Sequence, residues 1–390
     1  MLSAVSENNA KQNQTRRTAM KIAVLFPGIG YHCDKPLLYY SGKLAAHYQY
    51  EIVKVPYTNL SRAIPEAFAD AYAQTETCLE DIDWSQYEDI LFISKSIGTA
   101  VAAAYAQKHD IICRNVYYTP LPQTFDLAPQ SGIAFHGTCD PWAATDVIET
   151  QCAERRMPLY ITEHADHSLE LPAGDASSPA KSKIQPNLCI LETAMALTEQ
   201  YIADGICYRA LCADEICLEL FHGFVRHQNV VKCWRKENEK WVIRDDPFID
   251  DWTADDYQIL VKCLKNTVQT GGLVYAAFKG YGVLDSQPFG GTLKAFVSVE
   301  PGLFGGEQGY LDLSSIHVSE DLRGKGIGQV LFHAARDWAK KKGGRKLYIS
   351  AHSAVETQAF YKAMGCVEAQ VYDPHHVEQE PYDCQLECAL

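Results

Sequence analysis

The chain has 390 residues, of which 47% are hydrophobic and 22% are charged. This composition is typical of a globular protein with a large core, and the length predicts two or three domains. The formal net charge of −14 argues against binding to nucleic acid or to anionic membrane surfaces, since both attract basic patches.

Residues 1–20 are polar and rich in Asn, Gln and Ser, and we expect a disordered leader rather than a signal peptide. No apolar run approaches the roughly 20 residues that cross a bilayer. The fourteen cysteines include no C-x-x-C pair, which argues against a zinc site. We therefore expect a cytoplasmic protein with reduced thiols, no metal and no membrane partner.

From residue 21 to residue 205, short β-rich runs alternate with helical patterns, which predicts a mostly parallel sheet with helices on both faces. The expected strands are 22–26, 51–55, 90–94, 116–118, 132–136 and 159–163. The expected helices are 37–47, 97–108, 143–155 and 190–202. Pro, Ala, Ser and Lys dominate residues 171–187, so this stretch is expected to be a loop.

Residues 206–390 have a different rhythm, which predicts a second, α+β domain with a mixed, largely antiparallel sheet. The expected helices are 218–226, 254–270, 329–342 and 355–364. The expected strands are 208–210, 273–278, 293–299, 310–318, 346–350, 366–372 and 384–388.

The stretch Ser94-Lys95-Ser96-Ile97-Gly98 lies between a predicted strand and a predicted helix. Small residues two before and two after Ser96 permit a tight turn that exposes its hydroxyl oxygen above the sheet. The same turn directs the Ile97 N–H toward a developing oxyanion. This pattern predicts a serine nucleophile.

The turn resembles the nucleophile elbow of α/β-hydrolases, and residues 21–205 are similar to small, lidless members of the dienelactone-hydrolase kind. In that family the acid and the histidine follow the serine, and the matching loops contain Asp140 and His167. The resemblance implies that His167 takes the proton of Ser96 and that Asp140 orients His167. It also implies a second oxyanion N–H near Ile29.

Two positions depart from the family pattern: Ser94 stands where Gly is usual, and Pro27 where many relatives have His. Neither change removes a catalytic atom. His164 and Asp146 are the nearby alternatives for the histidine and the acid, but both lie off the motif. A hydrolase fold used as a binding module is the other interpretation.

A second turn is rich in glycine, follows an apolar strand and opens an amphipathic helix. Its residues are Arg323, Gly324, Lys325, Gly326, Ile327 and Gly328. Backbone N–H groups and the positive end of the helix dipole make such a turn an anion site that suits a pyrophosphate. The preceding strands are consecutive, which excludes a dinucleotide fingerprint, and no Gly-Lys-Ser/Thr ends the turn, which excludes a P-loop.

The turn resembles the pyrophosphate loop of the GNAT acetyltransferase superfamily, and the resemblance covers residues 206–390. It implies that N–H groups of residues 323–328 bind the pyrophosphate of acetyl-CoA. It also implies that the backbone of Ile316, His317 and Val318 pairs with the pantetheine arm. Tyr361 matches the tyrosine that protonates the leaving thiolate.

Ala354 occupies the place where the family often has Asn. The general base remains open between Asp312, Glu300, Glu356 and a water chain. Residues 233–252 include several aromatic side chains, and in GNAT proteins this early helical region usually shapes the acceptor site.

These patterns together predict a bifunctional enzyme: an acetyl-CoA-dependent N-acetyltransferase acting on a small-molecule amine, joined to a serine hydrolase of an ester or amide. The alternative is that one domain is catalytic and the other binds a ligand or serves as a scaffold. The sequence gives no indication of the oligomeric state.

Overall fold

The computed structural model describes residues 20–61, 63–127, 131–172, 184–238, 240–284 and 287–390. The expected leader therefore lies almost wholly outside the described residues. The chain forms two compact units, residues 1–203 with 282–289, and residues 204–281 with 290–390. The domain limits at residues 205 and 206 stay a prediction.

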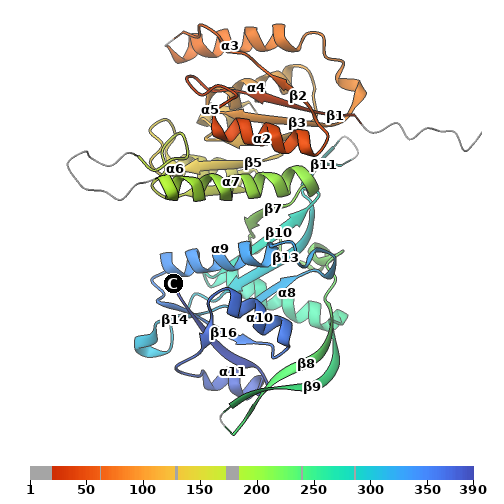
Figure 1. Ribbon diagram of the computed structural model, residues 1–390, viewed down its shortest axis with the longest axis vertical. Coiled ribbons are helices and arrows are strands. Elements are labelled where there is room, and N and C mark those ends of the chain that lie inside the picture. Colours follow the sequence, from red (N-terminus) through yellow and green to blue (C-terminus); the bar gives the residue numbers. More distant parts are fainter. Residues whose placement is uncertain (1–19, 62, 128–130, 173–183, 239, 285–286) are drawn as a thin grey trace, which may run out of the picture. The chain divides into compact units, whose positions relative to one another are not determined.

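The first unit is built on a six-stranded, all-parallel sheet (Figure 1). The strands are β1 (Met20–Phe26), β2 (Glu51–Lys54), β3 (Tyr87–Lys95), β4 (Arg114–Tyr118), β5 (Gly132–Gly137) and β6 (Leu159–Thr162). Their order is β2-β1-β3-β4-β5-β6, so the chain changes direction across the sheet between β1 and β3. Ligands of open α/β sheets bind at such a switch point, beyond the carboxyl ends of the strands.

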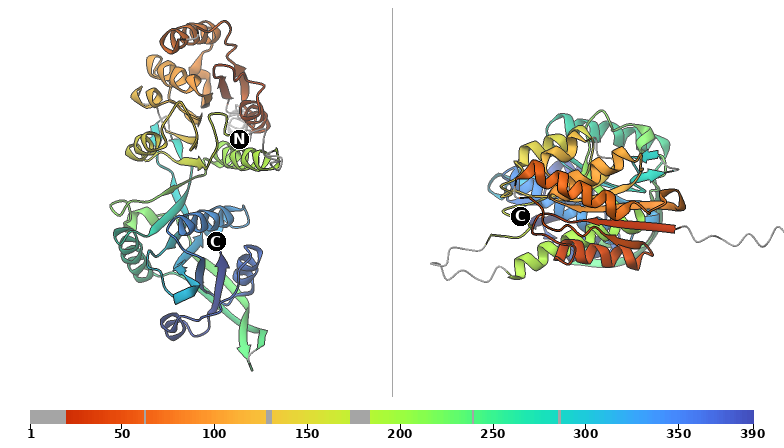
Figure 2. Two further views of the ribbon diagram at one scale, coloured as in Figure 1. Left: turned by 90° about the vertical axis from the view of Figure 1, so that its left-hand side faces the viewer. Right: turned by 90° about the horizontal axis from the view of Figure 1, so that it is seen from above.

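Helices cover both faces of this sheet, as Figure 2 shows. They are α2 (Pro36–His47), α3 (Ile64–Leu79), α4 (Ile97–Lys108), α5 (Pro122–Asp126), α6 (Thr145–Glu154) and α7 (Ile184–Asp204). Helices α2 and α7 share one face, where Ser41 and Thr198 both hydrogen-bond the buried Tyr118 hydroxyl. On the opposite face α3 and α4 pack over an apolar core that includes Phe92 and Val101.

The predicted strands and helices of this unit are all present, with ends that shift by a few residues. Helices α3 and α5 were missed, and the loop expected over 171–187 is partly wrong because α7 already begins at Ile184. Residues 173–183 of that stretch lie outside the described residues.

The second unit contains two four-stranded sheets. One has the order β15-β13-β10-β7 and is antiparallel; the other has the order β14-β16-β18-β17. Their strands are β7 (Cys207–Ala210), β10 (Leu273–Lys279), β13 (Thr292–Val299), β14 (Tyr310–Asp312), β15 (Ser315–Val318), β16 (Lys346–Ala351), β17 (Val367–Glu368) and β18 (Cys384–Ala389). The long helices are α8 (Ala254–Gln269) and α9 (Ile327–Lys341), and the shorter ones are α10 (Val355–Ala363) and α11 (Pro374–Gln379).

Four expectations for this unit are wrong, and one of them is the single strand over 310–318, which is divided into β14 and β15. The helix expected over 218–226 is only a 3₁₀ turn, η2 (Leu218–Phe221), and Gly223 follows it with φ of 97°, outside the helical range. The strand expected over 366–372 pairs only at Val367–Glu368, and α11 begins soon afterwards, capped by the Asp373 carboxylate.

The fourth concerns residues 233–252, where the sequence predicted no particular element and the GNAT resemblance implied an early helical region. These residues form no helix. They belong to a long antiparallel hairpin of β8 (His227–Glu237) and β9 (Lys240–Asp251). Asn238, at the turn, has φ of 49°, a left-handed value that Asn tolerates better than most residues. A second, short hairpin, β11 (Gly282–Leu284) and β12 (Gln287–Phe289), groups with the first unit.

Within the described ranges, every helix is too short or too polar to span a bilayer.

Candidate active sites

Ser96 sits at the turn between β3 and α4, at the switch point of the parallel sheet. Its backbone has φ of 56° and ψ of −127°, a combination that non-glycine residues rarely adopt. The turn is held by close packing: a Cβ on Gly98 would lie 2.4 Å from the Pro27 carbonyl oxygen. Such strain persists only where the surroundings hold it, as at a nucleophile elbow.

The structure brings Ser96, His167 and Asp140 into one hydrogen-bonded chain. The Ser96 Oγ lies 2.7 Å from His167 Nε2, and His167 Nδ1 lies 2.7 Å from Asp140 Oδ2. The Asp140 side chain is fully buried, whereas the His167 side chain keeps 19% of its surface exposed. A proton can therefore pass from Ser96 to His167, while the carboxylate fixes the orientation of the imidazole.

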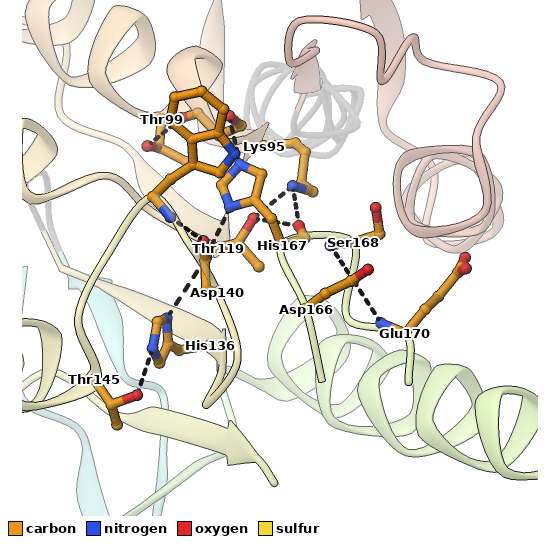
Figure 3. A network of polar contacts seen from close by, with 12 residues as sticks. Lys95, Thr99, Thr119, His136, Asp140, Thr145, Asp166, His167, Ser168 and Glu170 are labelled. Carbon is orange, nitrogen blue, oxygen red and sulfur yellow. Dashed lines mark hydrogen bonds and ion pairs between the residues drawn. The ribbon is translucent and has the colours of Figure 1, made fainter. Parts of the chain in front are cut away.

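Asp140 is held as an anion by its hydrogen bonds (Figure 3). Burial by itself raises the pKa of Asp140, but hydrogen bonds from His167 and from the Trp142 amide more than offset it. The pKa of Asp140 therefore lies below its usual range. The buried His136 ring also faces this carboxylate, with Nδ1 3.9 Å from Oδ2, and burial lowers the pKa of His136.

Two backbone N–H groups near Ser96 could stabilise an oxyanion. The loop after β1 contains a tight turn in which the Gly28 and Tyr31 backbones exchange hydrogen bonds of 3.0 and 3.1 Å. This turn leaves the Ile29 amide at the exposed tip, while the Ile97 amide lies at the first position of α4. Neither amide has a hydrogen-bond partner in the described part of the chain.

The two alternatives to the triad residues lie in other contacts. The His164 amide donates to the Thr138 hydroxyl, and the Asp146 carboxylate accepts from the Val147 amide at the start of α6.

The sequence interpretation gave no role to Lys95, yet its ammonium is buried beside the loop that carries His167.

In the second unit, the strand expected over 310–318 breaks into β14 and β15. The β14 strand pairs with β16 in parallel, whereas β15 pairs with β13 in the other sheet. Leu313 and Ser314 form the break, where the Leu313 amide still bonds the Tyr348 carbonyl. Residues 316–318 therefore lie on a strand that has separated from β16.

The glycine-rich turn follows β15 and leads into α9. Gly324 and Gly326 both have φ of 76°, and a Cβ on Gly324 would meet nothing within 4 Å. In the described chain, no protein acceptor bonds the successive amides of residues 324–328. Residues 323–326 are exposed, so this turn presents free N–H groups at the positive end of a 15-residue helix. These features fit a pyrophosphate.

Tyr361 lies on α10 and is almost fully buried, with 5% of its surface exposed. Its ring packs against Phe332 and Phe360, with ring centroids 6.2 and 5.2 Å away. Burial raises the pKa of Tyr361 above its ordinary value, so the phenol stays protonated at neutral pH. A protonated phenol can donate a proton to a thiolate.

The three expected candidates for a general base differ in their surroundings. Asp312 lies 3.2 Å from His376 Nε2, and Glu300 Oε1 accepts hydrogen bonds from the Thr267 and Ser314 hydroxyls. Glu356 is exposed in the first turn of α10.

A further candidate, Asp383, was not singled out from the sequence. Burial and the neighbouring Glu380 carboxyl raise the pKa of Asp383 to about 7. The charge of Asp383 also contributes to the raised pKa of Tyr361, so the two side chains lie in the same region of the domain. The local sequence does not mark this aspartate, because burial by tertiary packing is the largest cause of the raised pKa.

An open pocket of about 650 Å³ lies at the base of the β8–β9 hairpin. It is lined by Phe224, Val225, Arg226, His227, Asp251, Trp252, Tyr257 and Glu320. The Trp252 ring also contacts His317 of β15, with ring centroids 4.7 Å apart. Burial, together with the cations of Arg226 and Arg323, lowers the pKa of His317 to about 3. The ring is therefore neutral, although the residue keeps some exposed surface.

Residues 236–366 match the model of the acetyltransferase (GNAT) family. The C-terminal unit is a GNAT domain. No curated protein matched the chain.

Several solved structures are similar to parts of the chain. A putative streptothricin acetyltransferase from Bacillus anthracis, in complex with acetyl coenzyme A, is 13% identical over 47% of this chain and 98% of its own, with a TM-score of 0.34. A putative α/β hydrolase from Agrobacterium tumefaciens is 14% identical over 47% of this chain and 84% of its own, with a TM-score of 0.34. An α/β serine hydrolase homologue from Coxiella burnetii is 13% identical over 45% of this chain and 84% of its own, with a TM-score of 0.31.

The predicted fold class is confirmed. The first unit has the six-stranded parallel sheet of an α/β hydrolase, and the GNAT domain follows it in the same chain. Among the residues that the structure describes, no group of three or more His, Cys, Asp or Glu could hold a metal ion.

Proposed function

We propose that the chain is a bifunctional enzyme, with a serine hydrolase in the first unit and an acetyl-CoA-dependent N-acetyltransferase of small-molecule amines in the GNAT domain. The observation that carries the hydrolase is the continuous chain from Ser96 through His167 to Asp140 on a strained turn. The observation that carries cofactor binding is the exposed turn with free amides at residues 324–328.

In the hydrolase, His167 takes the proton as the Ser96 oxygen attacks an ester or amide carbonyl. The Ile29 and Ile97 amides stabilise the oxyanion. The imidazolium, held by Asp140, then gives its proton to the leaving alcohol or amine. Water, activated by the same histidine, releases the acid and regenerates Ser96.

In the transferase, acetyl-CoA supplies the acetyl group as a thioester. The free amides of residues 324–328 hold its pyrophosphate, beside the Arg323 amide, which bonds the Glu320 carbonyl at 3.4 Å. The backbone of residues 316–318 pairs with its pantetheine arm. Tyr361 is the proton donor to the thiolate, and Asp383, with its raised pKa, is our candidate to take a proton from the acceptor ammonium. The pocket beside Trp252 is the candidate acceptor site.

The hydrolase is tested with a fluorophosphonate probe on the whole folded protein. We expect labelling of Ser96, identified by peptide mass spectrometry, and no labelling of the variant Ser96→Ala. A matched control is Ser168→Ala, a serine beside His167 whose amide bonds Asp166. Labelling elsewhere, or none in folded protein, would contradict the hydrolase and favour a binding module.

The transferase is tested by isothermal titration with acetyl-CoA. Because Gly326 has φ of 76°, the variant Gly326→Val strains the turn, and we expect affinity to fall at least tenfold, about 1.4 kcal/mol. The control is Gly302→Ala, where a Cβ would meet nothing within 4 Å. No binding by the wild type, or equal binding by Gly326→Val, would contradict the cofactor assignment.

A further inference from the structure

Lys95 is a buried cation beside the candidate nucleophile. It ends β3 directly before Ser96, and only 1% of its surface is exposed. Lysine is seldom fully buried unless it is paired, so its partners need an explanation. The nucleophile elbow requires small residues at 94 and 98, but it makes no demand for a cation at 95.

The ammonium of Lys95, the Thr119 hydroxyl and the main-chain carbonyl of His167 form a triangle of hydrogen bonds, as Figure 3 shows. Its Nζ donates to the Thr119 hydroxyl at 2.5 Å and to the main-chain carbonyl oxygen of His167 at 2.6 Å. Thr119 itself donates to the same His167 carbonyl at 3.1 Å. The residue that carries the imidazole is thus fixed through its own backbone.

The ammonium also faces the turn after β1 that contains Ile29, because Nζ lies 5.1 Å from the centre of the Tyr31 ring. Lys95 therefore contacts the loop after β1, the residue that follows β4 and the histidine loop, while its own backbone forms part of the elbow. These are the segments that must keep one geometry for proton transfer from Ser96 to His167. Because two of its three N–H groups are hydrogen-bonded and only 1% of its surface is exposed, Lys95 has no access to substrate.

The other charged groups that act on Lys95 are carboxylates. Burial lowers the pKa of Lys95 to about 7, and the carboxylates of Asp140 and Asp166 oppose this shift. Asp166 also braces the histidine loop, because its carboxylate accepts from the Ser168 amide at 2.7 Å. Burying the charged form of a lysine costs free energy, and Lys95 also bonds a carbonyl of the site. Both facts favour a functional role for Lys95 over a role in core packing alone.

We propose that Lys95 is a positioning residue of the hydrolase, which holds the His167 loop so that the imidazole stays in line with Ser96 and Asp140. This inference rests on the proposed hydrolase function. Lys95 acts through the His167 main chain and touches neither substrate nor the reacting atoms.

The test uses the full chain and three variants. Lys95→Met keeps the length of the side chain and removes the charge, and Thr119→Val removes one corner of the triangle. Lys108→Met is the control, since Lys108 is exposed at the end of α4 and pairs with Glu76. Each variant is checked for folding by circular dichroism.

Two readouts are compared: the rate of fluorophosphonate labelling at Ser96, and the downfield proton resonance of the hydrogen bond between His167 Nδ1 and Asp140. We expect Lys95→Met to label at least about tenfold more slowly and to shift or lose the resonance. Thr119→Val should do the same to a smaller degree, and the double variant should be no slower than Lys95→Met alone.

Slow labelling with an unchanged resonance, or an unchanged rate in folded Lys95→Met, overturns the proposal. If Lys95→Met does not fold, Thr119→Val is judged by the same criteria. If the wild type is not labelled at all, the hydrolase function fails, and the resonance alone then decides whether Lys95 orders the histidine.

Discussion

At the scale of single residues, the first unit concentrates backbone strain and buried charge around one serine. Ser96 has a positive φ, Gly98 has no room for a side chain, and Lys95 is buried next to both. Each of these features costs stability, and each is held by the packing of neighbouring strands.

Gly98 gives the first prediction. A Cβ there would lie 2.4 Å from the Pro27 carbonyl oxygen and 2.5 Å from that of Phe26, and backbone atoms cannot move aside cheaply. We expect Gly98→Ala to destabilise the first unit by about 1–3 kcal/mol and to slow labelling of Ser96. Thermal unfolding and probe labelling measure this, with Gly302→Ala as the control. A variant as stable and as reactive as the wild type would contradict the close packing.

Lys95 gives a prediction on pH. Its ordinary pKa is 10.5 and its folded pKa is about 7, so between these values the unfolded chain binds more protons than the folded one. Stability therefore rises with pH through this window, by at most about 1.4 kcal/mol per pH unit. Urea unfolding at pH 7, 8 and 9 should show wild type gaining stability relative to Lys95→Met. If the difference in unfolding free energy between the two proteins did not change with pH, the pKa of Lys95 would not be shifted in the folded state.

At the scale of elements, two features distinguish the GNAT domain: the break between β14 and β15, and the β8–β9 hairpin. The hairpin bonds the segment after β16, where the Trp234 amide donates to the Ser353 carbonyl at 2.8 Å and Arg235 donates to the Ser353 hydroxyl at 2.6 Å. Its base forms the pocket beside Trp252. The hairpin thus stands where a helical region was expected to shape the acceptor site.

Trp252 gives the prediction at this scale. Its ring forms part of the pocket and packs on His317, so Trp252→Ala should raise KM for the acceptor amine about tenfold. The Kd for acetyl-CoA should stay within about twofold, because the glycine-rich turn is unchanged. Acceptors come from a screen of metabolites that follows thiol release. The control is Trp241→Ala. Trp241 lies on β9, and its indole N–H donates to the Glu368 carboxylate of β17. If KM rose equally in both variants, the acceptor site would not be the pocket beside Trp252.

At the scale of the whole molecule, one chain joins an α/β-hydrolase fold to a GNAT domain, and the two activities that we propose for them would produce and consume an amine. Hydrolysis of an amide releases an amine, and a GNAT-type transferase acetylates one. We hypothesise that both domains act on one compound. Unrelated substrate profiles for the two activities would contradict this coupling.

Coupling predicts a distinct product for each single-site variant. With an amide substrate found in the screen, the wild type should yield the acetylated amine, Ser96→Ala should yield nothing, and Tyr361→Phe should accumulate the free amine. Mass spectrometry of the products distinguishes these outcomes. The control is Tyr382→Phe, an exposed tyrosine with 69% of its surface accessible, which should behave as the wild type. An acetylated product from Ser96→Ala would mean that the two activities are independent.

The sequence by itself determined both fold classes, because alternating β and α patterns and glycine-bearing turns are local features. It placed Ser96, Asp140 and His167 at strand ends, and the glycine-rich turn at the start of α9. The tertiary structure decided what depends on residues distant in the chain: the partners of Lys95, the raised pKa of Asp383, and the hairpin that forms the pocket. These follow from packing and burial, which no local pattern records.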